Sequence, residues 1–358
     1  MPVILGSPDA TVEISLPGHP DEEELDRRTF NGTVVALTAD ALLPKTPTLP
    51  ERVGPAHLRY LQACVQKLWA RDWTVGGAWL LRQATMLFQQ AKDLIDEGEY
   101  PSSLAPDLLK VGANLGVCGS FIAFDAGDMA TARRLAQDAR LLADGTDDGG
   151  LRAHVYATMA LQSTSLARLS GRRGPAREAL RFLDCAEDAA RYEMSPRLGA
   201  LINMRRATAA ALLHDENTAR GAVLTAYREL DRGPSSCDRP WFEFVTQAEV
   251  RGHEARAAAD AGDHKRAVIL YEQTLEDPTL LPRNRTFYEA RLASVRLEQG
   301  DRSGALETAR SALTALEGPV SGSVRTLDTL QPLSATGDED FNRRLAAVAH
   351  AMRRKYPA

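Results

Sequence analysis

The 358-residue sequence has few aromatic side chains and few of the residues that most often bind metals. Aromatics make up 6% of the chain, and there are seven histidines and four cysteines. The cysteines are far apart and none belongs to a C-x-x-C pair: Cys64, Cys118, Cys185 and Cys237. In a chain of this length, such thiols are typical of a reducing compartment rather than of a disulfide framework or a zinc site. We therefore expect a cytoplasmic protein.

Motifs for catalysis and cofactor binding are also missing. The sequence contains no P-loop, no G-x-G-x-x-G and no H-E-x-x-H, and its histidines are scattered. The string nearest to a G-x-S-x-G nucleophile elbow, Gly116 to Ser120, lacks that pattern. We expect no catalytic residues, no cofactor and no metal site.

Long apolar runs and an excess of positive charge are absent as well. No stretch of about 18 consecutive apolar residues occurs, so we expect no membrane-spanning helix and no membrane partner. The net charge of −5 disfavours direct nucleic-acid binding by this chain alone, because such binding needs a basic surface. The chain is rich instead in alanine and leucine, which favours closely packed helices over sheets.

A Gly-Asp turn recurs along the sequence with small residues at fixed distances from it. An alanine follows each glycine by five residues, and a small residue precedes it by seven. The three clear cases are Gly127-Asp128 with Ala132 and Ser120, Gly262-Asp263 with Ala267 and Ala255, and Gly300-Asp301 with Ala305 and Ala293. The glycine can end one helix in the left-handed conformation, the aspartate can cap the next, and the small residues let the two helices approach. This pattern is typical of the tetratricopeptide repeat.

Two weaker units fill the gaps between the clear ones. They are Gly174 with Ala167, Ala179 and Ala186, and His214-Asp215 with Ala207, Ala219 and Ala226. Arg71-Asp72 before Gly76 is a candidate for a sixth, degenerate unit. Because the repeating alanines are 38 to 48 residues apart, we expect extended helices or loops. The sequence predicts an all-α, tetratricopeptide-like helical repeat superhelix.

The change of composition along the chain predicts three segments. Residues 1–50 contain seven prolines and an acidic run, which indicates an arm with one candidate helix from Asp26 to Leu42. Residues 51–317 hold the repeats. Residues 318–358 are expected to cap the array with helices, one of which begins near Asp338. Its apolar stripe is Phe341, Leu345, Val348 and Met352.

The repeat spacing also predicts which residues line a ligand groove. In a regular stack, the first helices of the units line the concave surface, which is the usual ligand surface. The predicted groove residues are Phe121, Phe124, Thr164, Arg168, Met204, Thr208, Glu249, Arg256, Phe287 and Ser294. A buried core position is the alternative role for Phe121, Phe124 and Met204.

An arginine run, Arg168, Arg172, Arg173, Arg177 and Arg181, is the most concentrated charge in the sequence. It is either a solvated face and loop around Gly171 or an anion-binding patch for a peptide carboxylate, a phosphate or nucleic acid. Both interpretations stay open at this point.

Several stretches resemble a known family. They are Pro240-Trp241, the segment from Glu249 to Ala255, the later residues Arg285, Tyr288 and Ser323-Val324-Arg325, and the string Asp26-Arg27-Arg28-Thr29-Phe30. Together these resemble the C-terminal sensor half of actinobacterial transcription regulators with an Xre-type helix-turn-helix. In that family the DNA-binding half precedes the sensor, and the Pro-rich arm here is too short to hold it. The chain is either a stand-alone relative or continues upstream.

The function expected from these features is binding. We expect a regulatory protein whose repeat groove takes a peptide, a small signalling molecule or a partner protein, with any DNA contact made elsewhere. The alternative is a scaffold or assembly factor that binds a folded protein. An enzyme would need acids or histidines that converge in space. A homodimer is left open.

Overall fold

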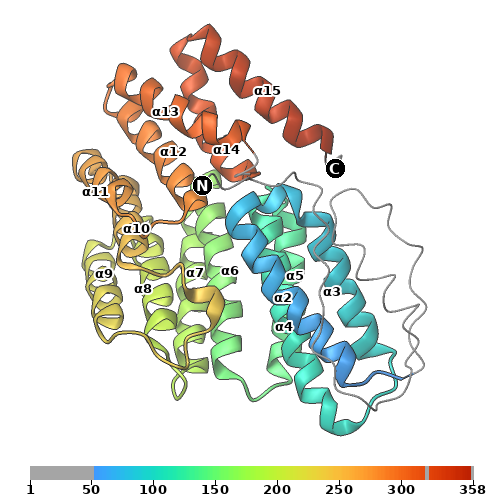
Figure 1. Cartoon of the computed structure of the whole chain (residues 1–358). Helices are drawn as coiled ribbons and strands as arrows, with labels where there is room; N and C mark the ends of the chain where they lie inside the picture. The colour runs from blue at the N-terminus through green and yellow to red at the C-terminus, as the bar shows by residue number, and fades with distance from the viewer. Residues whose placement is uncertain (1–51, 319–321, 356–358) are drawn as a thin grey trace, which may run out of the picture. The chain divides into compact units, whose positions relative to one another are not determined.

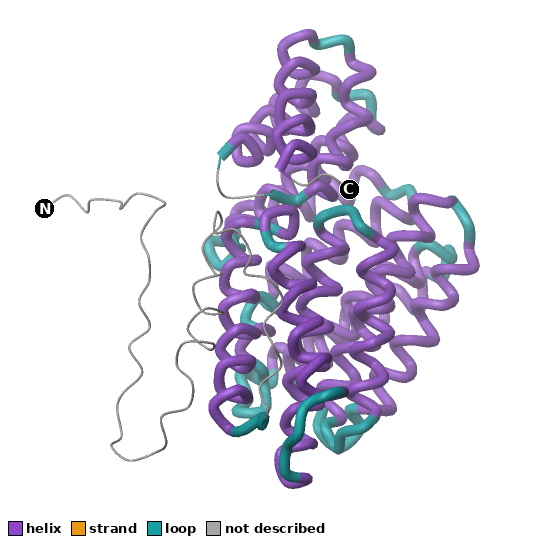
Figure 2. The backbone as a smooth tube through the Cα atoms, turned by 90° about the vertical axis from the view of Figure 1, so that its right-hand side faces the viewer, coloured by secondary structure: helices purple, strands orange, loops and turns teal. Residues whose placement is uncertain are grey.

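A computed structural model describes residues 52–318 and 322–355 of the chain, and every regular element in them is helical (Figures 1 and 2). The predicted arm of residues 1–50, with its candidate helix from Asp26 to Leu42, lies outside the described residues. The elements in chain order are α2 (Pro55–Val75), η2 (Gly77–Trp79), α3 (Leu81–Asp96), η3 (Ser102–Leu104), α4 (Ala105–Asp125), α5 (Met129–Asp144), α6 (Gly149–Ser170), α7 (Arg173–Ala189), α8 (Pro196–Ala211), α9 (Glu216–Asp231), η4 (Pro240–Phe242), α10 (Gln247–Asp260), α11 (His264–Glu276), α12 (Pro282–Glu298), α13 (Arg302–Glu317), α14 (Val324–Leu330), η5 (Gln331–Thr336) and α15 (Glu339–Lys355).

The helices pack in sequential pairs, α4 with α5, α6 with α7, α8 with α9, α10 with α11 and α12 with α13 (Figure 1). These five pairs are the five units that the spacing predicts, and they confirm the all-α, tetratricopeptide-like fold. The first helices of successive units also contact one another, from α4 through α6, α8 and α10 to α12. We call the surface that these first helices share the inner face.

The turn between the helices of a unit has the predicted chemistry. In the α4–α5 turn, Gly127 has φ of +82°, and the Asp128 carboxylate accepts a hydrogen bond from the Thr131 backbone N–H at 2.9 Å. The left-handed conformation carries little cost at glycine, and the carboxylate satisfies a backbone donor that the helix start would otherwise leave unpaired. Gly262-Asp263 and Gly300-Asp301 repeat this arrangement.

The two weaker units depart from the pattern in different ways. His214 takes the left-handed position with φ of +60°, and Asp215 caps α9 as predicted. The assignment of Gly174 to the turn is wrong, because Gly171 is the left-handed residue, with φ of +64°, and Gly174 lies in the first turn of α7. Helix α7 therefore starts about one turn early, while Ala179 keeps its buried position.

The small residues lie at the helix crossings. Ser120 and Ala132 of the α4–α5 unit are fully buried, and the Ser120 hydroxyl donates to the Ala132 carbonyl oxygen at 2.8 Å. The corresponding residues of the α10–α11 and α12–α13 units are equally buried. Ala219 is the exception, since it is half-buried. Close approach of the paired helices thus rests on alanine and serine, as the spacing predicts.

The sixth unit proposed around Arg71-Asp72 has no turn at that dipeptide. Helix α2 continues through it to Val75 and ends at Gly76, whose φ is +77°. Asp72 is fully buried. Its position inside the helix directs a carboxylate into the protein instead of capping a new helix.

The C-terminal region contains α14, η5 and α15. Helix α15 begins at Glu339, and the Asp338 carboxylate accepts the Phe341 backbone N–H at 2.8 Å. The predicted apolar stripe of α15 is buried and belongs to a cluster formed with α12, α13 and α14. The division of the chain at residues 50 and 317 stays a prediction.

Helix α2 is joined to the start of α14. The Gly322 backbone N–H donates to the Val75 carbonyl oxygen at 2.6 Å, and the Ala78 N–H donates to the Gly322 carbonyl oxygen at 2.9 Å. A Cβ atom at position 322 would lie 2.2 Å from the Trp79 ring, so the close approach requires glycine. The first described helix is therefore in direct contact with the segment that precedes α14.

Candidate functional site

The predicted groove residues lie on the inner face, where most of them are buried. Those below a tenth of their full exposure are Phe124, Thr164, Met204, Thr208, Glu249 and Arg256. Those of intermediate exposure are Phe121, Arg168, Phe287 and Ser294. The repeat phase thus places all ten on the first helices, but the inner face is packed at several of them. Their role in binding stays a prediction.

One group of charges on the inner face, the paired cluster, consists of Asp72, Asp125 and Arg283. The Arg283 guanidinium reaches Asp72 at 3.0 Å and Asp125 at 2.8 Å, and all three side chains are buried. Asp125 also accepts hydrogen bonds from the Gly77 N–H and the Ser323 hydroxyl, at 2.8 Å and 2.7 Å. These contacts bring together α2, α4, α12 and the start of α14.

Burial dominates the titration of the paired cluster. It raises the pKa of Asp72 to about 7, against the attraction of Arg283, and repulsion from Asp125 adds to the rise. Burial lowers the pKa of Arg283, but Asp125 and Asp72 more than offset this and raise it overall. The ring of Phe121, a predicted groove residue, lies 5.1 Å below the guanidinium. Phe121 therefore supports an ion-pair network.

Glu249, another predicted groove residue, is held by neighbours on α12. It accepts hydrogen bonds from the Tyr288 hydroxyl at 2.8 Å and from the Asn284 side-chain amide. Burial raises the pKa of Glu249 to about 7, although both hydrogen bonds oppose the rise. With these bonds made, the carboxylate joins α10 to α12 and points away from solvent.

A second group of charges, the arginine cluster, consists of Arg168, Arg256, Arg291, Arg325 and Asp260. The Asp260 carboxylate accepts two hydrogen bonds from Arg168 Nε, at 2.9 and 3.1 Å, and one from Arg168 Nη2. Arg325 donates to the hydroxyl of Ser165. The five charged side chains come from α6, α10, α12 and α14, helices that are far apart in the sequence.

Aromatic rings order the arginines of this cluster. The Cζ atoms of Arg256 and Arg291 lie 5.6 and 5.3 Å from the centroid of the Phe287 ring. The Arg325 Cζ lies 4.0 Å from the centroid of the Phe124 ring. A guanidinium over an aromatic face is attracted by the ring quadrupole and is fixed in orientation. Four predicted groove residues, Phe124, Arg168, Arg256 and Phe287, thus meet in this cluster.

The sequence analysis did not identify Arg205, Arg291 or Arg325 as site residues. Arg205 and Arg291 occupy the same position of the repeat, which could have revealed them. The residue two before the small residue of the first helix is Arg205 in α8, His253 in α10 and Arg291 in α12. Arg205 is buried, its Nη1 atom has no hydrogen-bond partner, and burial lowers its pKa to about 9. Arg325 lies beyond the repeats, so the repeat spacing cannot predict its position.

The arginine run of α6 and α7 does not form one patch. Arg168 turns inward to Asp260, while Arg172, Arg177 and Arg181 are exposed. Arg173 donates to the Leu213 carbonyl oxygen at 2.8 Å. The solvated-face interpretation therefore holds for the part after Gly171, and Arg168 belongs to the inner face.

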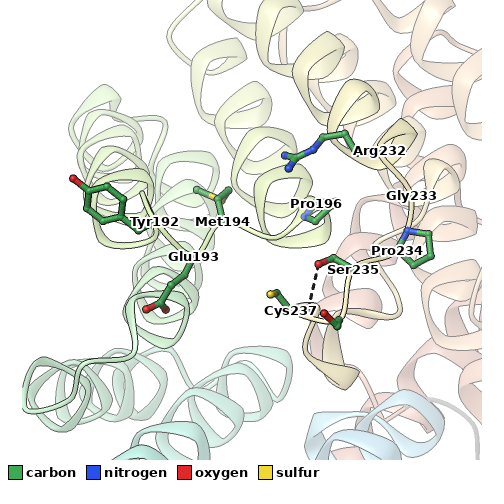
Figure 3. Close-up of a pocket in the computed structure, with 10 residues that line it drawn as sticks. Tyr192, Glu193, Met194, Pro196, Arg232, Gly233, Pro234, Ser235 and Cys237 are labelled. Atoms are coloured by element: carbon green, nitrogen blue, oxygen red, sulfur yellow. Dashed lines mark hydrogen bonds between the residues drawn. The ribbon is translucent and has the colours of Figure 1, made fainter.

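Two surface pockets lie away from the predicted groove residues. The larger, of about 470 Å³, is formed by the α7–α8 and α9–η4 loops and is lined by Tyr192, Pro196 and Cys237 among others (Figure 3). The other lies between η5 and α15. Neither contains any of the ten predicted residues. Tyr192, which is 93% exposed, points out from the rim of the larger pocket.

Three further findings concern the described residues. They contain no group of three or more His, Cys, Asp or Glu side chains placed to hold a metal ion. All four cysteines are free, Cys64 and Cys118 buried and Cys185 and Cys237 exposed. The helical stretch Ser102–Asp125 is long and apolar enough to cross a membrane, but 78% of its apolar window is buried, as in the core helix of a soluble protein.

Comparison with known proteins gave one class of match. No family model and no curated protein matches the chain. Among solved structures, the crystal structure of NprR in complex with its cognate peptide NprX is similar, with a TM-score of 0.48 and 16% sequence identity. The match covers 84% of this chain and 71% of that chain.

Proposed function

We propose that the protein is a non-catalytic regulatory protein whose inner face binds a peptide, a small signalling molecule or a partner protein. The observation that carries the proposal is the partly buried Phe287 ring flanked by the guanidinium groups of Arg256 and Arg291. An aromatic ring beside fixed hydrogen-bond donors offers an apolar contact and polar recognition at one place. Helix α6 adds Arg168, which pairs with Asp260 on the helix that carries Arg256, and α14 adds Arg325, which stacks on Phe124.

The regulatory context rests on the sequence. The strings from Glu249 to Ala255 and from Ser323 to Arg325 resemble the sensor half of actinobacterial Xre-type transcription regulators. Both strings contribute to the inner face, since Glu249 binds Tyr288 and Arg325 stacks on Phe124. We propose a cytoplasmic sensor whose DNA contact is made by another segment or protein.

Calorimetric titration of the purified chain with size-fractionated peptides and metabolites from cell extract tests this function. We expect saturable binding that Phe287→Leu weakens, because leucine keeps the apolar volume but removes the ring faces on which the two guanidinium groups lie. Leu169→Ala, an exposed position at the end of α6, is the matched control and should bind as the wild type does. Absence of saturable binding would overturn the proposal.

A scaffold that binds a folded protein is the second candidate. The exposed Tyr192 at the rim of the α7–α8 loop pocket favours it, because exposed tyrosines are common anchors at protein interfaces (Figure 3). Binding that Tyr192→Ala abolishes and Phe287→Leu leaves unchanged would establish this candidate in place of the first.

A further inference from the structure

We propose that the arginine cluster is a binding site for an oxyanion, the phosphate or carboxylate group of a small ligand. This inference rests on the proposed function, because it names the chemistry that the inner face recognises. Four arginines on four helices, with one carboxylate among them, form the site: Arg168, Arg256, Arg291, Arg325 and Asp260.

The charges of the cluster are not balanced by its own carboxylate. Asp260 is engaged by Arg168 through three hydrogen bonds. Within residues 52–318 and 322–355, no ion pair or hydrogen bond joins Arg256 or Arg291 to an acid. Arg325 bonds the neutral Ser165 hydroxyl. A buried or half-buried cation without a counter-ion is costly unless a ligand supplies one.

More distant acids act on the cluster without closing this gap. Burial lowers the pKa of Arg256 and Arg291, and Asp260 opposes this lowering without a hydrogen bond to either. Glu298 also attracts Arg291, and Asp125 and Asp328 attract Arg325. Asp125 is already bound by Arg283, and Glu298 and Asp328 are exposed. The cluster therefore carries more positive than negative charge.

Two of the unpaired donors are buried atoms. The Nε atoms of Arg256 and Arg291 have no hydrogen-bond partner, and Arg256 is 8% exposed. Burial lowers the pKa of Arg256, and repulsion from Arg168 and Arg291 lowers it further. A bound anion would accept hydrogen bonds from these two groups.

The choice of side chains also suits an oxyanion. Arginine presents a planar fork of N–H donors that matches the geometry of phosphate and carboxylate. The Phe287 ring lies against the guanidinium groups of both Arg256 and Arg291, and Phe124 lies against that of Arg325. Stacking fixes the orientation of the guanidinium groups before the ligand binds. Less conformational entropy is therefore lost on binding.

Sodium pyrophosphate and citrate are the probes for the test, each titrated into the full chain against sodium chloride at equal ionic strength. We expect saturable binding of at least one of them to the wild type, and the preferred anion identifies the source as phosphate or carboxylate. Arg256→Gln and Arg291→Gln should each weaken that binding by at least about tenfold, because each removes a charge-assisted donor. Arg256→Lys keeps the charge but not the fork and should give an intermediate loss.

The control is Arg343→Gln, on the exposed side of α15, where the arginine pairs with Asp340. It should bind the anions as the wild type does. Circular dichroism and the unfolding midpoint show whether each variant is folded, so that lost binding can be assigned to the site. Equal affinity in the Arg256→Gln and Arg343→Gln proteins, or no binding above the chloride control, would overturn the proposal.

The outcome is separable from that of the proposed function. In one outcome, Arg256→Gln loses anion binding, but no ligand from the extract binds in a way that Phe287→Leu weakens. That result would support the oxyanion site and contradict the sensor role. An extract ligand weakened by Phe287→Leu, with neither anion bound, would keep the sensor and remove the oxyanion site.

Discussion

The paired cluster and the arginine cluster lie on the same inner face, yet their charges are arranged in opposite ways. In the paired cluster, two carboxylates enclose one guanidinium, which reaches both within 3.0 Å. In the arginine cluster, the one carboxylate, Asp260, pairs with Arg168, and among the described residues Arg256 and Arg291 pair with no acid. A buried cation paired with acids fixes structure, whereas buried cations without a paired acid leave capacity for an anionic ligand. The difference separates a region that holds helices together from one that is suited to binding.

Loss of the cation from the paired cluster should have the largest effect. Arg283→Met leaves two buried carboxylates without their counter-ion, and we expect the free energy of unfolding to fall by about 3 kcal/mol or more. Urea denaturation followed by circular dichroism measures this. Arg343→Met, at an exposed ion pair, should cost less than about 1 kcal/mol. A small loss of unfolding free energy in Arg283→Met would mean that the paired cluster does not stabilise the fold more than the arginine cluster does.

A change of shape beside the paired cluster should have the next largest effect. The new Cβ of Gly322→Ala would lie 2.2 Å from the Trp79 ring and displace the segment that carries Ser323. We expect a loss of about 1–3 kcal/mol in unfolding free energy, as for overpacking. Gly174→Ala is the matched control, because nothing lies within 4 Å of its added Cβ in the first turn of α7. Similar unfolding midpoints for Gly322→Ala and Gly174→Ala would contradict the close contact between Gly322 and Trp79.

The pH dependence of stability should show a smaller signature, from Glu249. Its pKa is raised to about 7 in the folded protein from an ordinary value of 4.5, so the folded state binds more protons than the unfolded state between these values. Stability contributed by this group is therefore present below about pH 4.5 and is lost as the pH rises toward 7. Glu249→Gln should flatten that decline in thermal unfolding midpoints, and Glu216→Gln, at the exposed start of α9, should not. An identical pH profile in Glu249→Gln would contradict the raised pKa.

The arginine cluster should respond least in the ligand-free protein. Arg256→Gln and Arg291→Gln each remove a cation that has no ion pair, and we expect the free energy of unfolding to stay within about 0.5 kcal/mol of the wild type or to rise. Chemical denaturation in chloride buffer, without phosphate or citrate, measures it. Losses near that of Arg283→Met would show that these arginines hold the fold together.

The fold could be predicted from the sequence because its determinants are local. The turn glycine, the capping aspartate and the alanine five residues after the glycine all act within one unit, as at Gly127, Asp128 and Ala132. The error at Gly174 was local too, since a glycine three residues earlier can end α6 and let α7 start sooner. Ala179 is buried all the same, but the residue five after Gly171 is Ala176, which is also fully buried.

The site was less predictable, because its contacts join distant parts of the chain. The phase placed Arg168 and Arg256 on first helices but could not show that Arg168 reaches Asp260, 92 residues away. Asp72, read from sequence as a turn residue, binds Arg283 at a separation of 211 residues. Arg325 stands outside the repeats altogether. Spacing describes neighbours in a stack, and contacts across the inner face depend on how far successive units rotate.

The join between α2 and the α12–α14 region has a consequence for how the protein unfolds. In an open array of repeats each unit contacts its neighbours, so the end units open first and independently. Here the Gly322 backbone and Arg283 fasten the first described helix to the last units. We expect amide hydrogens in α2 and α12 to exchange together, at the rate of a single cooperative opening, instead of showing the fast exchange of frayed ends. Shortening the array from its C-terminal side would then loosen α2 as well, and the protein would behave as a closed unit rather than as a chain of separable repeats.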